Sequence, residues 1–170
     1  MSRLDITYRG TVHQWHCDHM GHMNVMWYVG KFDEATWNLS AMMGMTAQYL
    51  KDAKRGMAAV DQRIAYRREA LPGDVLTIRT GIIEVRPKSV RFVHEMRRGD
   101  LGDLLATMVV TGVHIDAVGR RATPFAPAIF ASASYQRSGR MRRLGTRRPR
   151  CAAATPKRWC VLLLPPVEYV

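Results

Sequence analysis

The densest group of side chains able to do chemistry lies in residues 13–24 (HQWHCDHMGHMN). Four of the chain's six histidines fall in this stretch, together with a cysteine, an aspartate and an asparagine. Imidazole and carboxylate groups act as general acids and bases, and carboxylates and thiolates act as nucleophiles. We therefore expect the functional site in this stretch.

The same residues leave other interpretations open. Histidine, cysteine and aspartate suit zinc, but their spacing matches no standard zinc motif, and we expect no metal site. Cys17 is a nucleophile by type, although the adjacent charge of Asp18 opposes formation of its thiolate. Asp18 could also do no more than cap a turn, and Asn24 could serve only as a helix cap.

The element that follows the cluster is predicted to be a helix over residues 25–43. Asn24 is a good N-cap and Gly44 a good stop signal. Because this helix is apolar nearly all round, we expect it to be buried. Amides at its N-terminus would attract developing negative charge beside any carboxylate held there. Apolar or small residues recur at helical spacing: Val29, Phe32, Thr36, Leu39 and Met43.

The rest of the chain reads mainly as strands. Turn signals such as Leu71-Pro72-Gly73-Asp74 separate them, and residues 47–56 and 116–127 are expected to be linkers. One strand, one helix and then four antiparallel strands predict an α+β fold, with one sheet wrapped around a long central helix. The expected strands cover residues 4–12, 57–69, 75–85, 90–96 and 104–115.

Charge divides the 170-residue chain into two unequal parts. Residues 132–170 hold nine Arg or Lys and one acid, so they carry +8 of the net +12 and leave +4 for residues 1–131. We expect a domain over 1–131 and a basic, unstructured tail over 132–170, with an Arg-rich binding arm as the alternative for the tail. We expect no nucleic-acid partner for the domain.

Nothing in the sequence suggests export or a membrane-spanning segment. No run of about 18 apolar residues is present, and the first ten residues lack the apolar core of a secretory signal. Three cysteines, Cys17, Cys151 and Cys160, form no even disulfide framework. A cytoplasmic protein is the simplest expectation.

Residues 18–28 (DHMGHMNVMWY) resemble the active-site segment of hotdog-fold thioesterases of the 4-hydroxybenzoyl-CoA thioesterase type. That signature is roughly Asp-x-x-Gly-His-Val-Asn-Asn-x-x-Tyr. Met23 replaces its valine and Val25 its second asparagine. Three later segments also resemble the family: residues 65–74, 89–92 and 113–116. The resemblance therefore covers about residues 4–128. The matching positions are Asp18, Gly21, His22, Asn24 and Tyr28.

The resemblance implies a catalytic role for three residues. Asp18 matches the family's carboxylate, which serves as nucleophile or as general base on water. His22 and Asn24 would orient groups or bind water, and amides near residues 23–25 would polarise the thioester carbonyl. One branch of the family uses a helix glutamate instead, which makes Glu34 a secondary candidate.

The resemblance also implies a substrate and an assembly. The substrate would be an acyl-CoA of unknown acyl group, with no cofactor beyond the CoA that it carries, and the protein would be a homodimer or a dimer of dimers. Arg91 is a candidate for the CoA phosphates, because arginine suits phosphate oxygens. Further substrate contacts would come from Gly21, Val25 and Tyr28, and the acyl pocket from Trp27, Tyr28, Met57 and Val60.

Two other functions remain open at this point. A non-catalytic acyl-CoA-binding module would bind the ligand without turnover. A hotdog hydratase or dehydratase would also use a loop aspartate and histidine, but in a segment with an asparagine-proline pattern that this chain lacks.

Overall fold

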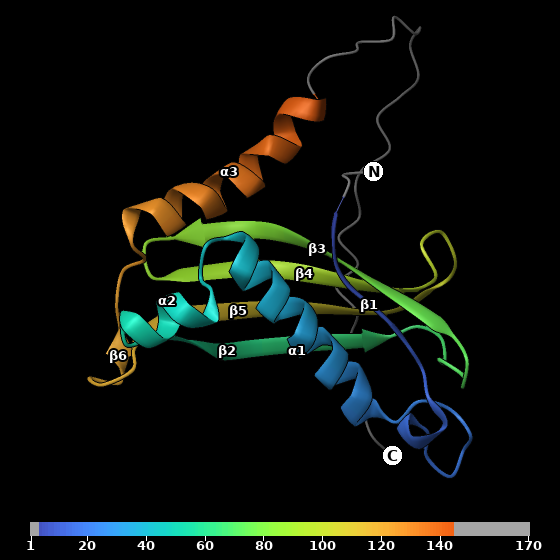
Figure 1. Ribbon diagram of the computed structural model, residues 1–170. Coiled ribbons are helices and arrows are strands. Elements are labelled where there is room, and N and C mark those ends of the chain that lie inside the picture. Colours follow the sequence, from blue (N-terminus) through green and yellow to red (C-terminus); the bar gives the residue numbers. More distant parts are fainter. Residues whose placement is uncertain (1–3, 145–170) are drawn as a thin grey trace, which may run out of the picture.

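A six-stranded antiparallel sheet curls around helix α1 in the computed structural model, which describes residues 4–144 (Figure 1). The strand order is β1-β3-β4-β5-β2, and the short β6 pairs with β5. The strands are β1 (Asp5–Thr11), β2 (Arg55–Tyr66), β3 (Val75–Arg86), β4 (Ser89–Arg98), β5 (Leu104–Asp116) and β6 (Arg121–Ala122). The helices are the 3-10 turn η1 (Gln14–His16), α1 (Val25–Met42), α2 (Ala47–Asp52) and α3 (Pro127–Leu144).

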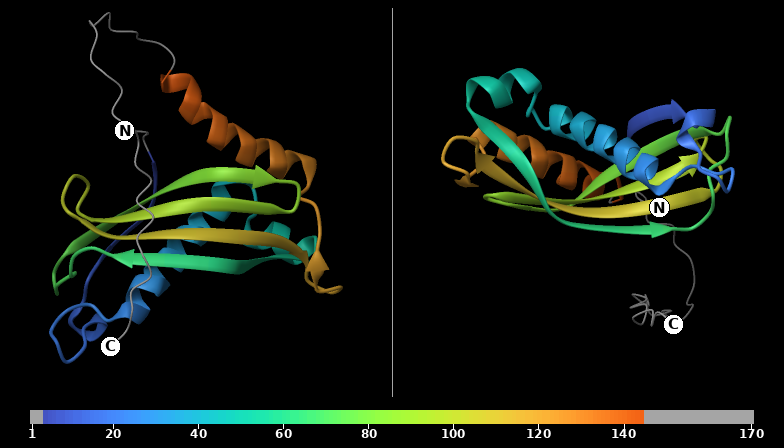
Figure 2. Two further views of the ribbon diagram at one scale, coloured as in Figure 1. Left: turned by 180° about the vertical axis from the view of Figure 1, so that it is seen from behind. Right: turned by 90° about the horizontal axis from the view of Figure 1, so that it is seen from below.

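The predicted α+β class, with one sheet and one long helix across it, is confirmed. Figure 2 shows α1, α2 and α3 on the same face of the sheet. None of the described elements covers the opposite face. Strand β5 shows this one-sided packing. Met108 and Val110 are buried beneath the helices, whereas Val109 and Thr111, which alternate with them, face the other side. This alternation is typical of an antiparallel sheet with one packed face.

Helix α1 begins and ends where the sequence predicts. The Asn24 side chain accepts a hydrogen bond from the Met26 amide, and Gly44, just past the helix, has φ +94°, in the left-handed region that favours glycine. Its buried stripe of Tyr28, Phe32, Ala35 and Leu39 packs on the sheet. Burying a side chain such as Phe32 contributes about 1.5–3 kcal/mol.

The expectation that α1 is buried all round is wrong for the single chain. Val29, which belonged to the predicted apolar stripe, is 38% exposed, Trp37 is 55% exposed and Met26 is 62% exposed. The sheet packs against only one side of the helix. A stripe of apolar side chains on α1 is therefore left open beside the β2 edge.

Two helices replace segments that were expected to be irregular. In α2, the Thr46 side chain caps the helix by accepting from the Tyr49 amide, and Leu50 packs against the core. The short amphipathic turn was mistaken for a linker because its helical signal spans only six residues.

Helix α3 corrects the expected boundary at residue 131. Ile129 and Ala133 lie one turn apart and are both buried, and the Gln136 side chain donates to the Met42 carbonyl oxygen at 2.9 Å. These contacts stabilise the first turns of α3, and the helix continues through residues 132–144, where an unstructured tail was expected. Residues 145–170, the remainder of that predicted tail, lie outside the described part of the chain.

A buried polar chain ties α1 to three strands. The His94 Nε2 lies 3.0 Å from the Thr36 hydroxyl, and its Nδ1 lies 2.6 Å from Thr80, whose hydroxyl lies 2.6 Å from that of Thr7. Thr36 also donates to the Phe32 carbonyl oxygen, so His94 must donate through Nε2 and accept through Nδ1. Burial lowers the pKa of His94 from 6.5 to about 3, which matches this neutral form.

Candidate active site at the start of helix α1

The loop between β1 and α1 folds back on itself and presents Asp18. The Asp18 amide donates to the His22 carbonyl oxygen, and the Gly21 amide donates to that of Asp18 at 3.0 Å. Gly21 has φ +80°, which few residues other than glycine adopt readily. We expected Gly21 to contact substrate, and the structure shows that it makes the turn between Asp18 and His22 possible.

The Asp18 carboxylate is held but still accessible. One oxygen accepts from the Met20 amide at 2.9 Å, and the other lies 3.4 Å from the Asn24 Nδ2 donor. Its side chain is 21% exposed. The arrangement fixes the carboxylate at the mouth of the loop without enclosing it, as a nucleophile or general base requires.

His22 lies between two carboxylates. Its Nδ1 is 3.9 Å from an Asp18 oxygen, and its Nε2 is 3.8 Å from a Glu69 oxygen. Both distances are too long for hydrogen bonds, and they become ion pairs only when the ring is protonated. The structure thus brings Asp18, His22 and Asn24 together and adds Glu69, which was not among the expected site residues.

Only one of the three expected amides is free to bind a substrate oxygen. The Met23 amide donates to the Ala70 carbonyl oxygen at 2.8 Å, and the Asn24 amide donates to that of His16 at 2.9 Å. The Val25 amide donates to no acceptor among residues 4–144. At the first position of α1, it adds a hydrogen-bond donor to the positive end of the helix dipole.

Tyr28, an expected substrate contact, is buried and hydrogen-bonded to the segment after β2. It is 4% exposed, and its hydroxyl accepts from the Ala70 amide at 3.0 Å and donates to the Arg68 carbonyl oxygen at 3.4 Å. Burial is the main cause of the raised pKa of this phenol. Tyr28 therefore fastens α1 to the segment that follows β2.

His13 and His16, two further members of the cluster, belong to a group of aromatic rings. The His13 and Trp15 rings stack with centroids 4.3 Å apart, and the His16 ring packs on Trp27 at the same separation. Within residues 4–144, no three histidine, cysteine or acidic side chains are grouped so as to hold a metal ion.

A cavity of about 490 Å³ opens between the second half of α1, α2 and the inner face of the sheet. Of the four residues expected to line an acyl pocket, Met57 lies in its wall, whereas Val60 points outward and is 61% exposed. Sequence reasoning missed most of the lining. Thr36 and Ser40, polar and one turn apart on an apolar helix, were the available signal. The wall also includes Trp37, Met43, Phe92 and Gln62.

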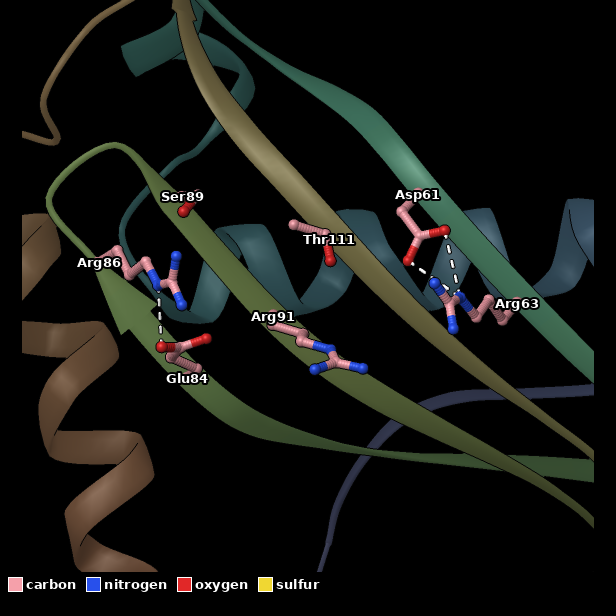
Figure 3. A pocket seen from close by; sticks show the side chains of 7 residues that line it. All are labelled: Asp61, Arg63, Glu84, Arg86, Ser89, Arg91 and Thr111. Carbon is pink, nitrogen blue, oxygen red and sulfur yellow. Dashed lines mark hydrogen bonds and ion pairs between the residues drawn. The ribbon is translucent and has the colours of Figure 1, made fainter. Parts of the chain in front are cut away.

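Arg91 does not belong to this site. It lies in a hollow on the opposite face of the sheet, between the Asp61–Arg63 and Glu84–Arg86 pairs (Figure 3). Its neighbours Val90 and Phe92 illustrate the alternation, because both are buried whereas Arg91 is exposed. Arg98, at the end of β4 nearest the Asp18 loop, lies seven residue steps along the strand from Arg91, which is about 23 Å.

Comparisons with known proteins agree with this geometry. Solved structures with the same fold include the protein SAV2348 from Staphylococcus aureus in complex with CoA (19% identity, 81% of this chain and 87% of that chain, TM-score 0.75). Another is Slr0204, a 1,4-dihydroxy-2-naphthoyl-CoA thioesterase from Synechocystis (18%, 76% and 95%, 0.68). A third is BH1999, a gentisyl-coenzyme A thioesterase (23%, 75% and 98%, 0.66).

These likenesses establish the hotdog fold. The model of the thioesterase-like superfamily matches residues 12–132, which include the loop, α1 and all of the sheet except β1. The chain therefore belongs to the thioesterase-like superfamily, as the Asp18 segment predicted. No curated protein matches the chain. Among the helices of residues 4–144, none is long and apolar enough to cross a membrane.

Proposed function

We propose that the chain hydrolyses acyl-CoA thioesters at the start of α1. The observation that carries this proposal is an accessible, oriented Asp18 carboxylate in the loop that leads into α1, together with the unbonded Val25 amide at the start of that helix. A thioester carbonyl that accepts from the Val25 amide becomes more electrophilic, and the amide then stabilises the oxyanion that forms.

In the proposed reaction, water and the thioester give a carboxylic acid and free CoA. Asp18 either attacks the carbonyl carbon itself, forming an anhydride that water opens, or takes a proton from the attacking water. The carbon–sulfur bond breaks, and the thiolate leaves and takes up a proton. Asn24 holds the Asp18 carboxylate in place. His22 lies close enough to this carboxylate to exchange a proton with it through one water.

Known relatives of the fold support CoA as the carrier. One was solved in complex with CoA, and two others act on CoA thioesters. The cavity of about 490 Å³ is our candidate for the acyl pocket, since ligand pockets commonly measure about 300–1,000 Å³.

We further propose that the protein acts as a homodimer joined through β2. This strand of 12 residues lies at an edge of the sheet, and the open stripe on α1 lies beside it. A second copy pairing antiparallel would set the Tyr66 end of one β2 against the Arg55 end of the other. The Asp18 loop is tied to the Tyr66 end, and the cavity includes Arg55, so one protomer's carboxylate would approach its partner's cavity.

Release of free CoA from a panel of acyl-CoAs tests the reaction. We expect Asp18→Asn to abolish turnover without loss of folded structure, because the amide can neither attack nor take a proton. Glu84→Gln is the control, since this acid lies on the opposite face and pairs with Arg86. Wild-type binding of CoA esters with no turnover on any of them would point instead to a binding module, and full activity in Asp18→Asn would reject the mechanism.

A further inference from the structure

His16 holds together the loop that carries Asp18. It is 6% exposed, and its Nδ1 accepts from the His13 amide at 3.0 Å. Its carbonyl oxygen accepts from the Asn24 amide at 2.9 Å, next to the free amide of Val25. Because a backbone N–H can only donate, His16 Nδ1 carries no proton, and the ring is neutral with its proton on Nε2.

Lys31 is a buried charge that the proposed reaction does not use. It is 4% exposed, and its ammonium group donates to the Tyr8 hydroxyl at 3.0 Å and to the Thr11 carbonyl oxygen at 3.5 Å. No carboxylate among residues 4–144 lies within 4.0 Å of it. Burying an ammonium group without a counter-ion is costly, and its field extends further than it would in water.

Lys31 and His13 both disfavour a second proton on the His16 ring. His13 and Trp15 contact this ring from the loop, Trp27 contacts it from α1, and Lys31 lies one helical turn beyond Trp27. Burial lowers the pKa of His16 below its ordinary value of 6.5, and the charges of Lys31 and of protonated His13 add to this effect.

We propose that His16 is a positioning residue for the Asp18 loop, and that the buried charge of Lys31 keeps it in the neutral form that the loop requires. This inference rests on the proposed function for its effect on catalysis. A proton on Nδ1 would set two N–H groups against each other, at His13 and at His16, and would break the hydrogen bond that closes the loop. Asp18 and Asn24 would then lose their fixed relation to α1.

Histidine titration by NMR tests the physical part without any substrate. Lys31→Met and Lys31→Gln both remove the charge, and glutamine keeps a donor for Tyr8. We expect the pKa of His16 to rise toward 6.5 in both, with the His13 and Asn24 amide signals titrating at the same midpoint. Lys88→Gln, an equal change of charge on the β3–β4 turn, should leave all three as in wild type. An unchanged His16 midpoint in both Lys31 variants, or amides that do not follow it, would overturn the proposal.

The catalytic part is tested by comparing kcat/KM at about pH 6 and about pH 8. A raised pKa places more of His16 in the protonated form at pH 6, so kcat/KM at pH 6 relative to that at pH 8 should fall in the Lys31 variants. Adding His16→Asn, which keeps an acceptor near the Nδ1 position but does not titrate, should restore the ratio. His16→Phe, which keeps the ring on Trp27 but no acceptor, should lower kcat/KM at both values. A ratio that Lys31 variants leave unchanged while His16 titrates would reject the positioning role. If no thioester is hydrolysed, the proposed function fails and the NMR result still decides the role of His16.

Discussion

Asn24 links the two halves of the candidate site with one side chain. Its Oδ1 accepts from the Met26 amide at 3.0 Å and so caps α1, while its Nδ2 lies 3.4 Å from the Asp18 carboxylate. The residue that caps the helix therefore also positions the Asp18 carboxylate, and the two roles can be separated by substitution.

We expect Asn24→Ala to lose the cap, which costs about 1 kcal/mol and lowers the Tm by about 2–4 °C. Asn24→Ser keeps a capping oxygen but is too short to reach Asp18, so it should keep most of the stability. Both variants should lower kcat, and thermal unfolding alongside CoA release would show the separation. A serine variant with wild-type kcat would remove the contact with Asp18 from the mechanism.

At the scale of elements, α1 is held to the sheet by both apolar packing and a neutral buried histidine. Phe32 packs on the His94 ring, and the Thr36 hydroxyl accepts a hydrogen bond from its Nε2. Protonating His94 in the folded state would place a charge in the core and leave both ring nitrogens as donors. Folding therefore has a built-in dependence on pH.

We expect stability to fall as the pH drops from about 6.5 toward about 3. Unfolded His94 takes up a proton near pH 6.5, whereas the folded protein, in which its pKa is about 3, resists doing so. The unfolded state thus binds more protons in this window, at a cost of up to about 1.4 kcal/mol per pH unit. Above pH 6.5 this residue adds no pH dependence.

Denaturant unfolding of the wild type and His94→Gln across this range would measure the effect. Glutamine can donate and accept but does not titrate, so the slope of unfolding free energy against pH should be shallower in the variant. His19→Gln, at an exposed loop position, is the matched control. Equal slopes in His94→Gln and the wild type would contradict the assignment.

At the scale of the whole molecule, the proposed dimer would cover both the exposed apolar side chains of α1 and the free edge of β2. Met26, Val29 and Trp37 would remain in water if the chain stayed monomeric, and β2 would leave a row of unpaired backbone groups. Long unpaired edges of this kind readily pair with another strand. A second copy would satisfy both needs at once.

We expect the wild type to have the mass of a dimer in light scattering coupled to gel filtration. Val60→Lys, which places a charge at the centre of β2, should shift the protein to monomer and lower the activity. Val60→Thr, of similar shape and neutral, should stay dimeric. A monomeric wild type with full activity would contradict the assembly that we propose.

The sequence predicted the parts of this molecule that depend on local signals. Asn24 and Gly44 set the bounds of α1, and the spacing from Asp18 to Asn24 located the site. What it missed depends on packing between distant segments: the burial of Ile129 that stabilises α3, and the exposure of Trp37. The carbonyl oxygens that accept from the Met23 and Asn24 amides also lie outside the motif or across the loop. The motif alone therefore overestimated the number of amides available to a substrate.

The Val25 amide gives the most direct test of the proposed mechanism. Proline is well tolerated at the first position of a helix, and Asn24 already has the extended backbone that precedes proline, so Val25→Pro removes this one donor and little else. We predict a folded protein, by circular dichroism, whose kcat for the best acyl-CoA is about 10²–10³-fold lower, while Val25→Ala, which keeps the amide, stays close to wild type. A folded Val25→Pro variant with the kcat of Val25→Ala would show that the thioester carbonyl is not activated at the start of α1.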